Sequence, residues 1–336
     1  MTTVAILGAG AWGTALAVHL AQRSAAKPRV RLWTRDLAQA AALTATRANG
    51  RYLPGVAVPE AVLIAADLAE LVDADLLFVA TPVAALPALI AAMRAAAIKA
   101  PLVTLCKGFA RSADLPGGVG LAHQLLAKQW VGPVAVASGP SFAEEVARGM
   151  PTALSVASAD AALAARVASL LRGGAFRAYE SDDVAGVEVG GAIKNVLAIA
   201  AGASDGLGFG HNARAALITR GLAETGRLSG ALGGRRETLM GLSGLGDLVL
   251  TCTGDQSRNR RVGLALAQGR QLADALAEMG HVAEGVASAR AARALGQHFG
   301  VDMPICEAVD RVLHEGLPVR HAVEALLKRE PRPELI

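Results

Sequence analysis

The sequence predicts an α/β fold in which a doubly wound, mostly parallel sheet is followed by a separate all-helical domain. Three observations predict it: a glycine loop near the start, short apolar runs alternating with alanine-rich helical stretches in the first half, and long helical segments without a strand in the second. A chain of 336 residues favours two domains. The composition changes near residue 185, so we place the domains at residues 1–185 and 186–336.

Apolar runs and helical periodicity give the expected elements. The runs expected to be strands are Thr3–Leu7, Arg29–Trp33, Leu76–Ala80, Leu102–Leu105, Val134–Ala137 and Ala153–Val156. Helical spacing predicts a first helix over Gly13–Gln22. In the second half it predicts helices over Val187–Gly202, Ala213–Leu228, Arg261–Gly269, Ala283–Phe299, Ile305–His314 and Val319–Lys328.

The composition excludes several classes of protein. With 53% hydrophobic and 18% charged residues, the chain is not intrinsically disordered. Aromatic residues are 3% and the net charge is +4, which argues against a nucleic-acid partner. The three cysteines form no C-x-x-C pair, which favours free thiols in the cytoplasm. The longest apolar stretch, Leu76–Met93, is interrupted by Pro82 and Pro87, so we expect no membrane span.

A glycine loop follows the first expected strand. Gly8, Gly10 and Gly13 have G-x-G-x-x-G spacing between that strand and a helix. This is the context of a dinucleotide-binding loop, in which the glycines permit the turn, the approach of the pyrophosphate and close helix packing. The helix N–H groups then face the anion. The motif therefore predicts a Rossmann-type domain that binds NAD(H) or NADP(H).

The end of the second expected strand bears on the choice of cofactor. An acidic side chain there accepts from the ribose 2′-hydroxyl of NAD, whereas an arginine meets the 2′-phosphate of NADP. The chain has Arg35 followed at once by Asp36, so the signal is mixed. The alternative interpretation is that Arg35 and Asp36 are a solvated pair on the surface, without a role in cofactor binding.

A lysine lies inside an apolar segment of the second half. Lys194 and Asn195 follow Gly190 and Gly191, which weaken a helix but let another group approach closely. If this helix is buried, desolvation lowers the pKa of Lys194 and makes it a usable proton donor or acceptor. No partner for its charge is predicted. The alternative is that Lys194 reaches from the helix edge to water.

Two further clusters carry polar groups. Asp247 ends a glycine turn, and Ser257-Arg258-Asn259 groups hydroxyl, guanidinium and amide donors before a helix, which suits a phosphate or another oxyanion. A nucleic-acid site or a solvated helix start are the alternatives there. Lys107, and Gly139 with Ser141, follow expected strands at the edge where doubly wound sheets bind ligands. The seven histidines are scattered, and no metal site is predicted.

Taken together, these motifs resemble a known family. The matching segments are GAGAWGTALA (8–17), KG (107–108), SGPSFAEEV (138–146), GGAIKN (190–195), NARAALITRGLAE (212–224), GLGDLVLTCT (244–253), SRNRRVG (257–263) and AEG (283–285). They look like bacterial glycerol-3-phosphate dehydrogenase, in consecutive order over nearly the whole chain. The resemblance implies reduction of dihydroxyacetone phosphate to sn-glycerol 3-phosphate with NADH or NADPH, a role in phospholipid synthesis, and a homodimer.

The resemblance also implies roles for individual residues. Lys194 is the proton acceptor in oxidation and the donor in reduction. The substrate contacts are Lys107, Gly139, Ser141, Lys194, Asp247, Ser257, Arg258 and Asn259. The cofactor contacts are Gly8, Gly10, Ala11, Trp12, Gly13, Arg35, Lys107, Ala143, Arg258, Val282 and Glu284, with Tyr52 near the adenine. The family often has serine where this chain has Ala11, so only the backbone can bind there.

Two other functions fit parts of the same pattern. One is a related β-hydroxyacid or polyol-phosphate dehydrogenase with the same domain plan and a helical lysine. The other is an NAD(P)-binding protein without catalytic activity. Such a protein would not need the phosphate-binding donors at Ser257-Arg258-Asn259.

Overall fold

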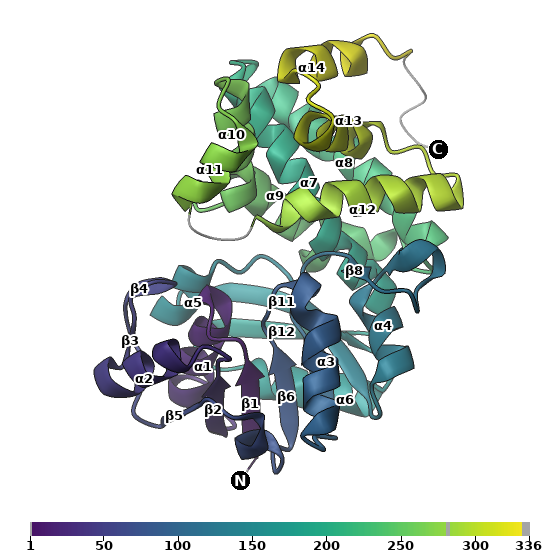
Figure 1. Ribbon diagram of the computed structural model, residues 1–336. Helices are drawn as coiled ribbons and strands as arrows, with labels where there is room; N and C mark the ends of the chain where they lie inside the picture. Colours follow the sequence, from purple (N-terminus) through teal and green to yellow (C-terminus); the bar gives the residue numbers. More distant parts are fainter. Residues whose placement is uncertain (1, 280–282, 331–336) are drawn as a thin grey trace.

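A computed structural model describes residues 2–279 and 283–330 (Figure 1). Its main feature is a sheet of eight strands in the N-terminal half. In order across the sheet these are β12 (Phe176–Ser181), β11 (Thr152–Ser158), β10 (Val134–Ser138), β7 (Leu102–Thr104), β6 (Leu76–Val79), β1 (Thr3–Leu7), β2 (Arg29–Trp33) and β5 (Val62–Ala65).

The strand order is that of a dinucleotide-binding sheet. From β5 to β10 the order is β5-β2-β1-β6-β7-β10, and each neighbouring pair in this stretch is parallel. This is the 3-2-1-4-5-6 order, in which the chain reverses its direction of travel across the sheet at β1. β11 pairs antiparallel with β10, and β12 is parallel to β11. The predicted doubly wound, mostly parallel sheet is confirmed.

Helices cover both faces of the sheet. Val4 and Ile6 of β1 belong to one buried cluster, with side chains from α1 (Ala11–Gln22), α5 (Ala143–Arg148) and α6 (Ala161–Leu171). Ala5 and Leu7 face the opposite cluster, which includes α3 (Leu86–Ala95) and α4 (Ala122–Gln129). Alternate residues of one strand are therefore buried on opposite sides, which explains its continuous apolar run.

Short elements complete the N-terminal half. They are α2 (Leu37–Thr46), the hairpin β3 (Ala48–Asn49) and β4 (Leu53–Ala57), the hairpin β8 (Ala110–Arg111) and β9 (Val119–Gly120), and the 3₁₀ turns η1 (Leu68–Leu71), η2 (Val83–Ala85) and η3 (Pro116–Gly118). The β3–β4 hairpin packs beside α1 and α5, near the glycine loop.

The second half is helical. Its elements are α7 (Val184–Gly206), α8 (Gly210–Ala231), the 3₁₀ turn η4 (Glu237–Met240), the π-helical turn η5 (Leu242–Gly246), α9 (Asp247–Thr253), α10 (Arg258–Ala267), α11 (Leu272–Met279), α12 (Glu284–Phe299), α13 (Pro304–His314) and α14 (Val319–Leu327). The central helix α7 packs against α8, α9, α10 and α12. It is long and apolar enough to cross a membrane, but 89% of its apolar window is buried inside the fold, as in a core helix.

The expected strands and helices are present, and the structure has further elements that were not predicted. All six expected strands form, and every helix expected in the second half is present within a few residues of its predicted bounds. β5, β12, α9, α11 and the hairpins β3–β4 and β8–β9 were not predicted. The helices α2, α4, α5 and α6 were expected only as helical stretches between the strands, without bounds. β12 is the last strand, and α7 begins three residues after its end. The domain division at residue 185 falls in the first turn of α7 and stays a prediction.

Candidate active site

The glycine loop joins β1 to α1 and leaves backbone donors open. Gly8 has φ +118°, and a Cβ at Gly13 would lie 2.0 Å from the carbonyl oxygen of Gly8. A Cβ at Gly10 would meet no atom within 4 Å, so the space in front of it is open. The first intrahelical bond is Thr14 N to Gly10 O, at 3.0 Å. The N–H groups at the start of α1, including those of Ala11 and Trp12, therefore have no acceptor within the helix, which suits an anion.

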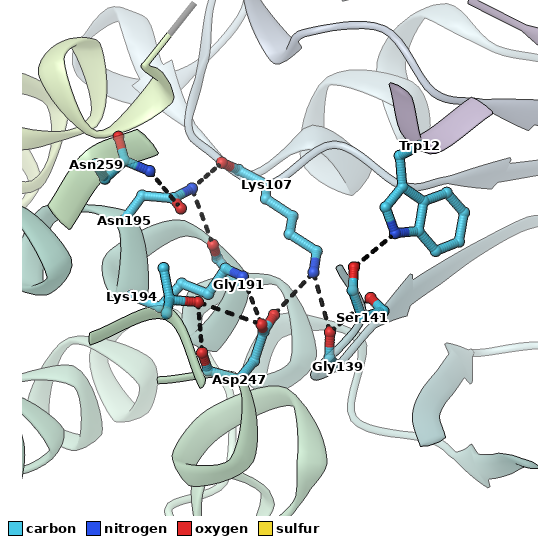
Figure 2. A network of polar contacts seen from close by, with 10 residues as sticks. Trp12, Lys107, Gly139, Ser141, Gly191, Lys194, Asn195, Asp247 and Asn259 are labelled. Carbon is cyan, nitrogen blue, oxygen red and sulfur yellow. Dashed lines mark hydrogen bonds and ion pairs between the residues drawn. The ribbon is translucent and has the colours of Figure 1, made fainter. Parts of the chain in front are cut away.

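Three charged side chains from distant segments meet at the other side of the site (Figure 2). Lys107 follows β7, Lys194 lies in α7, and Asp247 begins α9. Lys194 Nζ lies 2.5 Å from Asp247 Oδ1, and Lys107 Nζ lies 2.8 Å from Asp247 Oδ2. Asp247 is fully buried, and the hydroxyl of Thr251 donates to its backbone carbonyl at 2.6 Å. The expectation that nothing pairs with Lys194 is wrong, because one carboxylate holds both lysines.

Burial sets the proton affinity of Lys194. Only 7% of the residue is exposed, so the alternative in which it reaches water is excluded. Loss of hydration lowers the pKa of Lys194 to about 8; the Asp247 carboxylate opposes this shift, and the charge of Lys107 adds to it. The ammonium is therefore mostly protonated at pH 7, yet acidic enough to give up its proton readily.

The glycines before Lys194 let α7 approach its neighbours. A Cβ at Gly190 would lie 2.3 Å from the carbonyl oxygen of Ser243, and a Cβ at Gly191 would lie 2.8 Å from Ser138 Oγ. Because η5 and β10 contact the helix backbone at these points, Lys194, one turn later, is brought against the start of α9 and the carboxyl ends of the strands.

The loop after β10 connects the lysines to the glycine loop. Lys107 Nζ donates to the carbonyl of Gly139 at 3.1 Å, and Ser141 Oγ donates to the same carbonyl at 2.9 Å. Trp12 Nε1 donates to the carbonyl of Ser141 at 3.0 Å. Ala143 follows as the first residue of α5. Hydrogen bonds therefore connect Lys107, Gly139, Ser141 and Trp12 in one continuous network, as Figure 2 shows.

Asn195, for which the sequence predicted no role, connects the loop after β7 to α10. Its Nδ2 donates to the carbonyl of Lys107 at 2.8 Å, and its Oδ1 accepts from Asn259 Nδ2 at 2.9 Å. Asn259 Oδ1 in turn accepts from Gly285 N at 3.0 Å. This relay ties the loop after β7 to α7, α10 and the start of α12. The side chain of Asn259, expected to contact substrate, is bonded within the protein at both ends.

The residues of SRNRR have separate roles. Ser257 caps α10 by accepting from Arg260 N at 3.3 Å. The Arg260 guanidinium is held by Asp205 and Asp255. Arg258 is exposed, and no acceptor for its side chain is found among the described residues. Arg258 is therefore a cation at the start of α10 that is available to an anion.

The remaining cofactor candidates lie on either side of this centre. Burial raises the pKa of Glu284 at the start of α12, while the N–H of Val83 and the charge of Arg258 oppose the rise. Val282 falls outside the described residues. Tyr52 lies between β3 and β4, and the guanidinium carbon of Arg51 lies 5.2 Å from the centre of its ring.

Asp36 and Arg35, which follow the end of β2, differ in their contacts. The carboxylate of Asp36 accepts from Gln39 N at 3.1 Å and caps α2. Arg35 is exposed, with no partner for its guanidinium among the described residues. Asp36 is therefore bonded to the helix start, whereas the guanidinium of Arg35 is exposed to solvent; the contact of Arg35 with a cofactor stays a prediction.

Comparison with known proteins decides the family. Family models described as NAD-dependent glycerol-3-phosphate dehydrogenase N-terminus and C-terminus match residues 3–164 and 183–324. The chain belongs to the NAD-dependent glycerol-3-phosphate dehydrogenase family. It is 55% identical to glycerol-3-phosphate dehydrogenase [NAD(P)+] of Aromatoleum aromaticum, over 98% of this chain and 99% of that one. It is 50% identical to the Nitrosospira multiformis protein of the same name, over 99% of each chain.

The solved structures agree with this membership. The crystal structure of glycerol-3-phosphate dehydrogenase from Coxiella burnetii is 43% identical and has a TM-score of 0.92, covering 98% of this chain and 99% of that one. As a member of this family, the chain is an NAD(P)-dependent oxidoreductase. The groups at the glycine loop fit such a cofactor, because N–H donors and open space lie together there. No cluster of potential metal ligands occurs among the described residues.

Proposed function

We propose that this chain reduces dihydroxyacetone phosphate to sn-glycerol 3-phosphate with NADH or NADPH, and that Lys194 donates the proton. The observation that carries the proposal is the buried Lys194, with its pKa lowered to about 8, beside Lys107 and the open glycine loop. The family membership supports the reaction. The bound nicotinamide supplies the hydride; the protein orients the carbonyl carbon and handles one proton.

The two lysines act on the carbonyl oxygen of the substrate. As hydride reaches the carbonyl carbon, negative charge develops on the oxygen, and two ammonium groups in a desolvated site stabilise it. The Lys194 ammonium then transfers its proton to this oxygen. Asp247 keeps both ammonium groups on one side of the site through its two carboxylate oxygens, which limits their repulsion.

The phosphate of the substrate lies at the start of α10 in this proposal. The guanidinium of Arg258 forms no hydrogen bond or ion pair among the described residues, although its charge acts on Glu284, and it sits at the positive end of a helix. Binding there fixes the far end of the substrate, so that binding energy remote from the carbonyl positions the reacting end.

The full set of contacts follows the family pattern. We propose as substrate contacts Lys107, Gly139, Ser141, Lys194, Asp247, Ser257, Arg258 and Asn259, and as cofactor contacts Gly8, Gly10, Ala11, Trp12, Gly13, Arg35, Lys107, Ala143, Arg258, Val282 and Glu284, with Tyr52 near the adenine. The cellular setting is also a proposal: a cytoplasmic homodimer that supplies glycerophospholipid synthesis. The three buried, unpaired cysteines support a reducing compartment, and light scattering tests the dimer.

The test of the reaction is oxidation of NADH and NADPH in the presence of dihydroxyacetone phosphate. Parallel assays contain dihydroxyacetone, a panel of 2-keto acids, or no substrate. The proposal predicts turnover with the phosphate ester and very little with the others. Turnover of a keto acid at a comparable kcat/KM would favour the β-hydroxyacid alternative, and cofactor binding without any turnover would favour the non-catalytic one.

A further inference from the structure

The carbonyl oxygen of Ala9, in the middle of the glycine loop, accepts two side-chain hydrogen bonds. Gln39 Nε2 lies 2.7 Å from it and Asn49 Nδ2 lies 3.0 Å from it. Neither residue belongs to the motif or to the proposed set of contacts. A carbonyl can only accept, so both side chains must present their NH₂ groups to it.

Each amide is itself held in place. Thr34 Oγ1 donates to Gln39 Oε1 at 2.7 Å, which fixes the Gln39 side chain at the first turn of α2. Asn49 is 4% exposed, and its Nδ2 also donates to Thr14 Oγ1 at 2.7 Å. Asn49 therefore bonds to the chain just before and just after the turn that begins α1.

The two bonds fix the orientation of the peptide between Ala9 and Gly10. The described part of the chain contains no cis peptide bond, and in a trans peptide the C=O and N–H point in opposite directions. With the oxygen of Ala9 turned toward α2 and β3, the N–H of Gly10 points to the other side. A carbonyl turned toward the pyrophosphate would instead repel it, because both carry negative charge.

We propose that Gln39 and Asn49 are positioning residues of the dinucleotide site, which act by holding the Ala9 carbonyl away from the pyrophosphate. This inference rests on the proposed cofactor site at the glycine loop. Because the pyrophosphate is common to NADH and NADPH, the two hydrogen bonds to the Ala9 carbonyl affect the binding of both cofactors equally. Arg35 differs, because a contact with the 2′-phosphate would strengthen the binding of NADPH alone.

The experiment uses neutral variants of similar shape that cannot donate: Gln39→Met, Asn49→Leu and the double variant. Gln297→Met, at an exposed position near the end of α12, is the matched control. Dissociation constants for NADH, NADPH and ADP-ribose are measured by fluorescence and calorimetry without substrate. The thermal midpoint, and the kcat and KM for dihydroxyacetone phosphate at saturating cofactor, are measured on the same preparations.

Each single variant should weaken all three ligands about three- to tenfold, the range for loss of one hydrogen bond. The double variant should lose more than the product of the two single effects, since in each single variant the remaining amide still partly restrains the carbonyl. The kcat at saturating cofactor should stay within about twofold of the wild type. A purely structural role would lower the thermal midpoint and leave the dissociation constants unchanged.

Folded variants that bind NADH and NADPH as tightly as the wild type would overturn the inference. If Asn49→Leu does not fold, Gln39→Met decides alone, because Gln39 is only half-buried. Failure of the wild type to bind either cofactor would instead contradict the proposed cofactor site, so the two failures are distinguishable.

Discussion

The glycine loop and the Lys107–Asp247–Lys194 centre handle negative charge in opposite ways. At the glycine loop the donors are backbone N–H groups at the start of α1, and Gly8, Gly10 and Gly13 carry no side chain. At the lysine centre the donors are the ammonium groups of buried Lys194 and partly buried Lys107, both held by one buried carboxylate. Backbone geometry fixes the glycine loop, and charge balance fixes the lysine centre. Cofactor binding at the glycine loop should therefore be most sensitive to an added methyl group, and the activity of the lysine centre to a removed charge.

The largest effect is expected for Lys194→Ala. It removes the proton donor, so kcat for reduction of dihydroxyacetone phosphate should fall by at least ~10²-fold. Folding should survive because Asp247 keeps Lys107 as a partner at 2.8 Å. Steady-state kinetics and a thermal melt on the same preparation check both parts. An active Lys194→Ala enzyme would refute the proton-donor role.

Arg258→Ala should mainly raise KM for the phosphate ester. Loss of a charge-assisted bond costs about 1.5–3 kcal/mol, or roughly 10- to 150-fold in binding. The control substrate is dihydroxyacetone, which lacks the phosphate. If the variant loses as much activity with dihydroxyacetone as with its phosphate, Arg258 does not bind the phosphate.

Methyl groups added to the glycine loop test the backbone site. Gly13→Ala places a Cβ 2.0 Å from the Gly8 carbonyl oxygen, so it should lower the thermal midpoint and weaken both cofactors about tenfold or more. Gly10→Ala meets no protein atom, so it should weaken the cofactors and leave the midpoint unchanged. Gly230→Ala, in an exposed turn of α8 with the same open surroundings, is the control. Unchanged cofactor binding in Gly10→Ala would show that the pyrophosphate does not approach there.

The smallest effect concerns the choice of cofactor. Arg35 is exposed and Asp36 is bonded to the start of α2, so we expect use of both cofactors with a preference for NADPH. Arg35→Ala should raise KM for NADPH about tenfold and leave KM for NADH nearly unchanged. Equal changes for the two cofactors, or a wild type that strongly prefers NADH, would contradict this role.

The two regions also differ in how far the sequence predicts them. The glycine loop is contiguous, and its glycine spacing between an expected strand and an expected helix predicts its place and conformation. The pairing of Asp247 with both lysines was not predicted, because the partners lie 53 and 140 residues apart in the chain.

The missed strands have a similar explanation. β12 (Phe176–Ser181) alternates buried and exposed residues and includes charged side chains, unlike the buried central strands whose continuous apolar runs were recognised. β5 (Val62–Ala65) is a four-residue strand with β2 as its only neighbour in the sheet, and Leu63 on it is exposed. Edge strands bury less surface than central ones, so their sequences carry a weaker apolar signal.

The central claim is that burial tunes Lys194 to give a proton near neutral pH, and the pH dependence of kcat/KM for reduction tests it most directly. Since the pKa of Lys194 is lowered to about 8, the donor is present below this pH and lost above it. The rate should therefore fall with loss of a single proton as the pH rises through about 8, and the oxidation rate should rise over the same interval. The residual activity of Lys194→Ala should not show this fall in rate as the pH rises through about 8. A wild-type reduction rate that stays constant up to about pH 10, near the ordinary lysine pKa, would contradict the account.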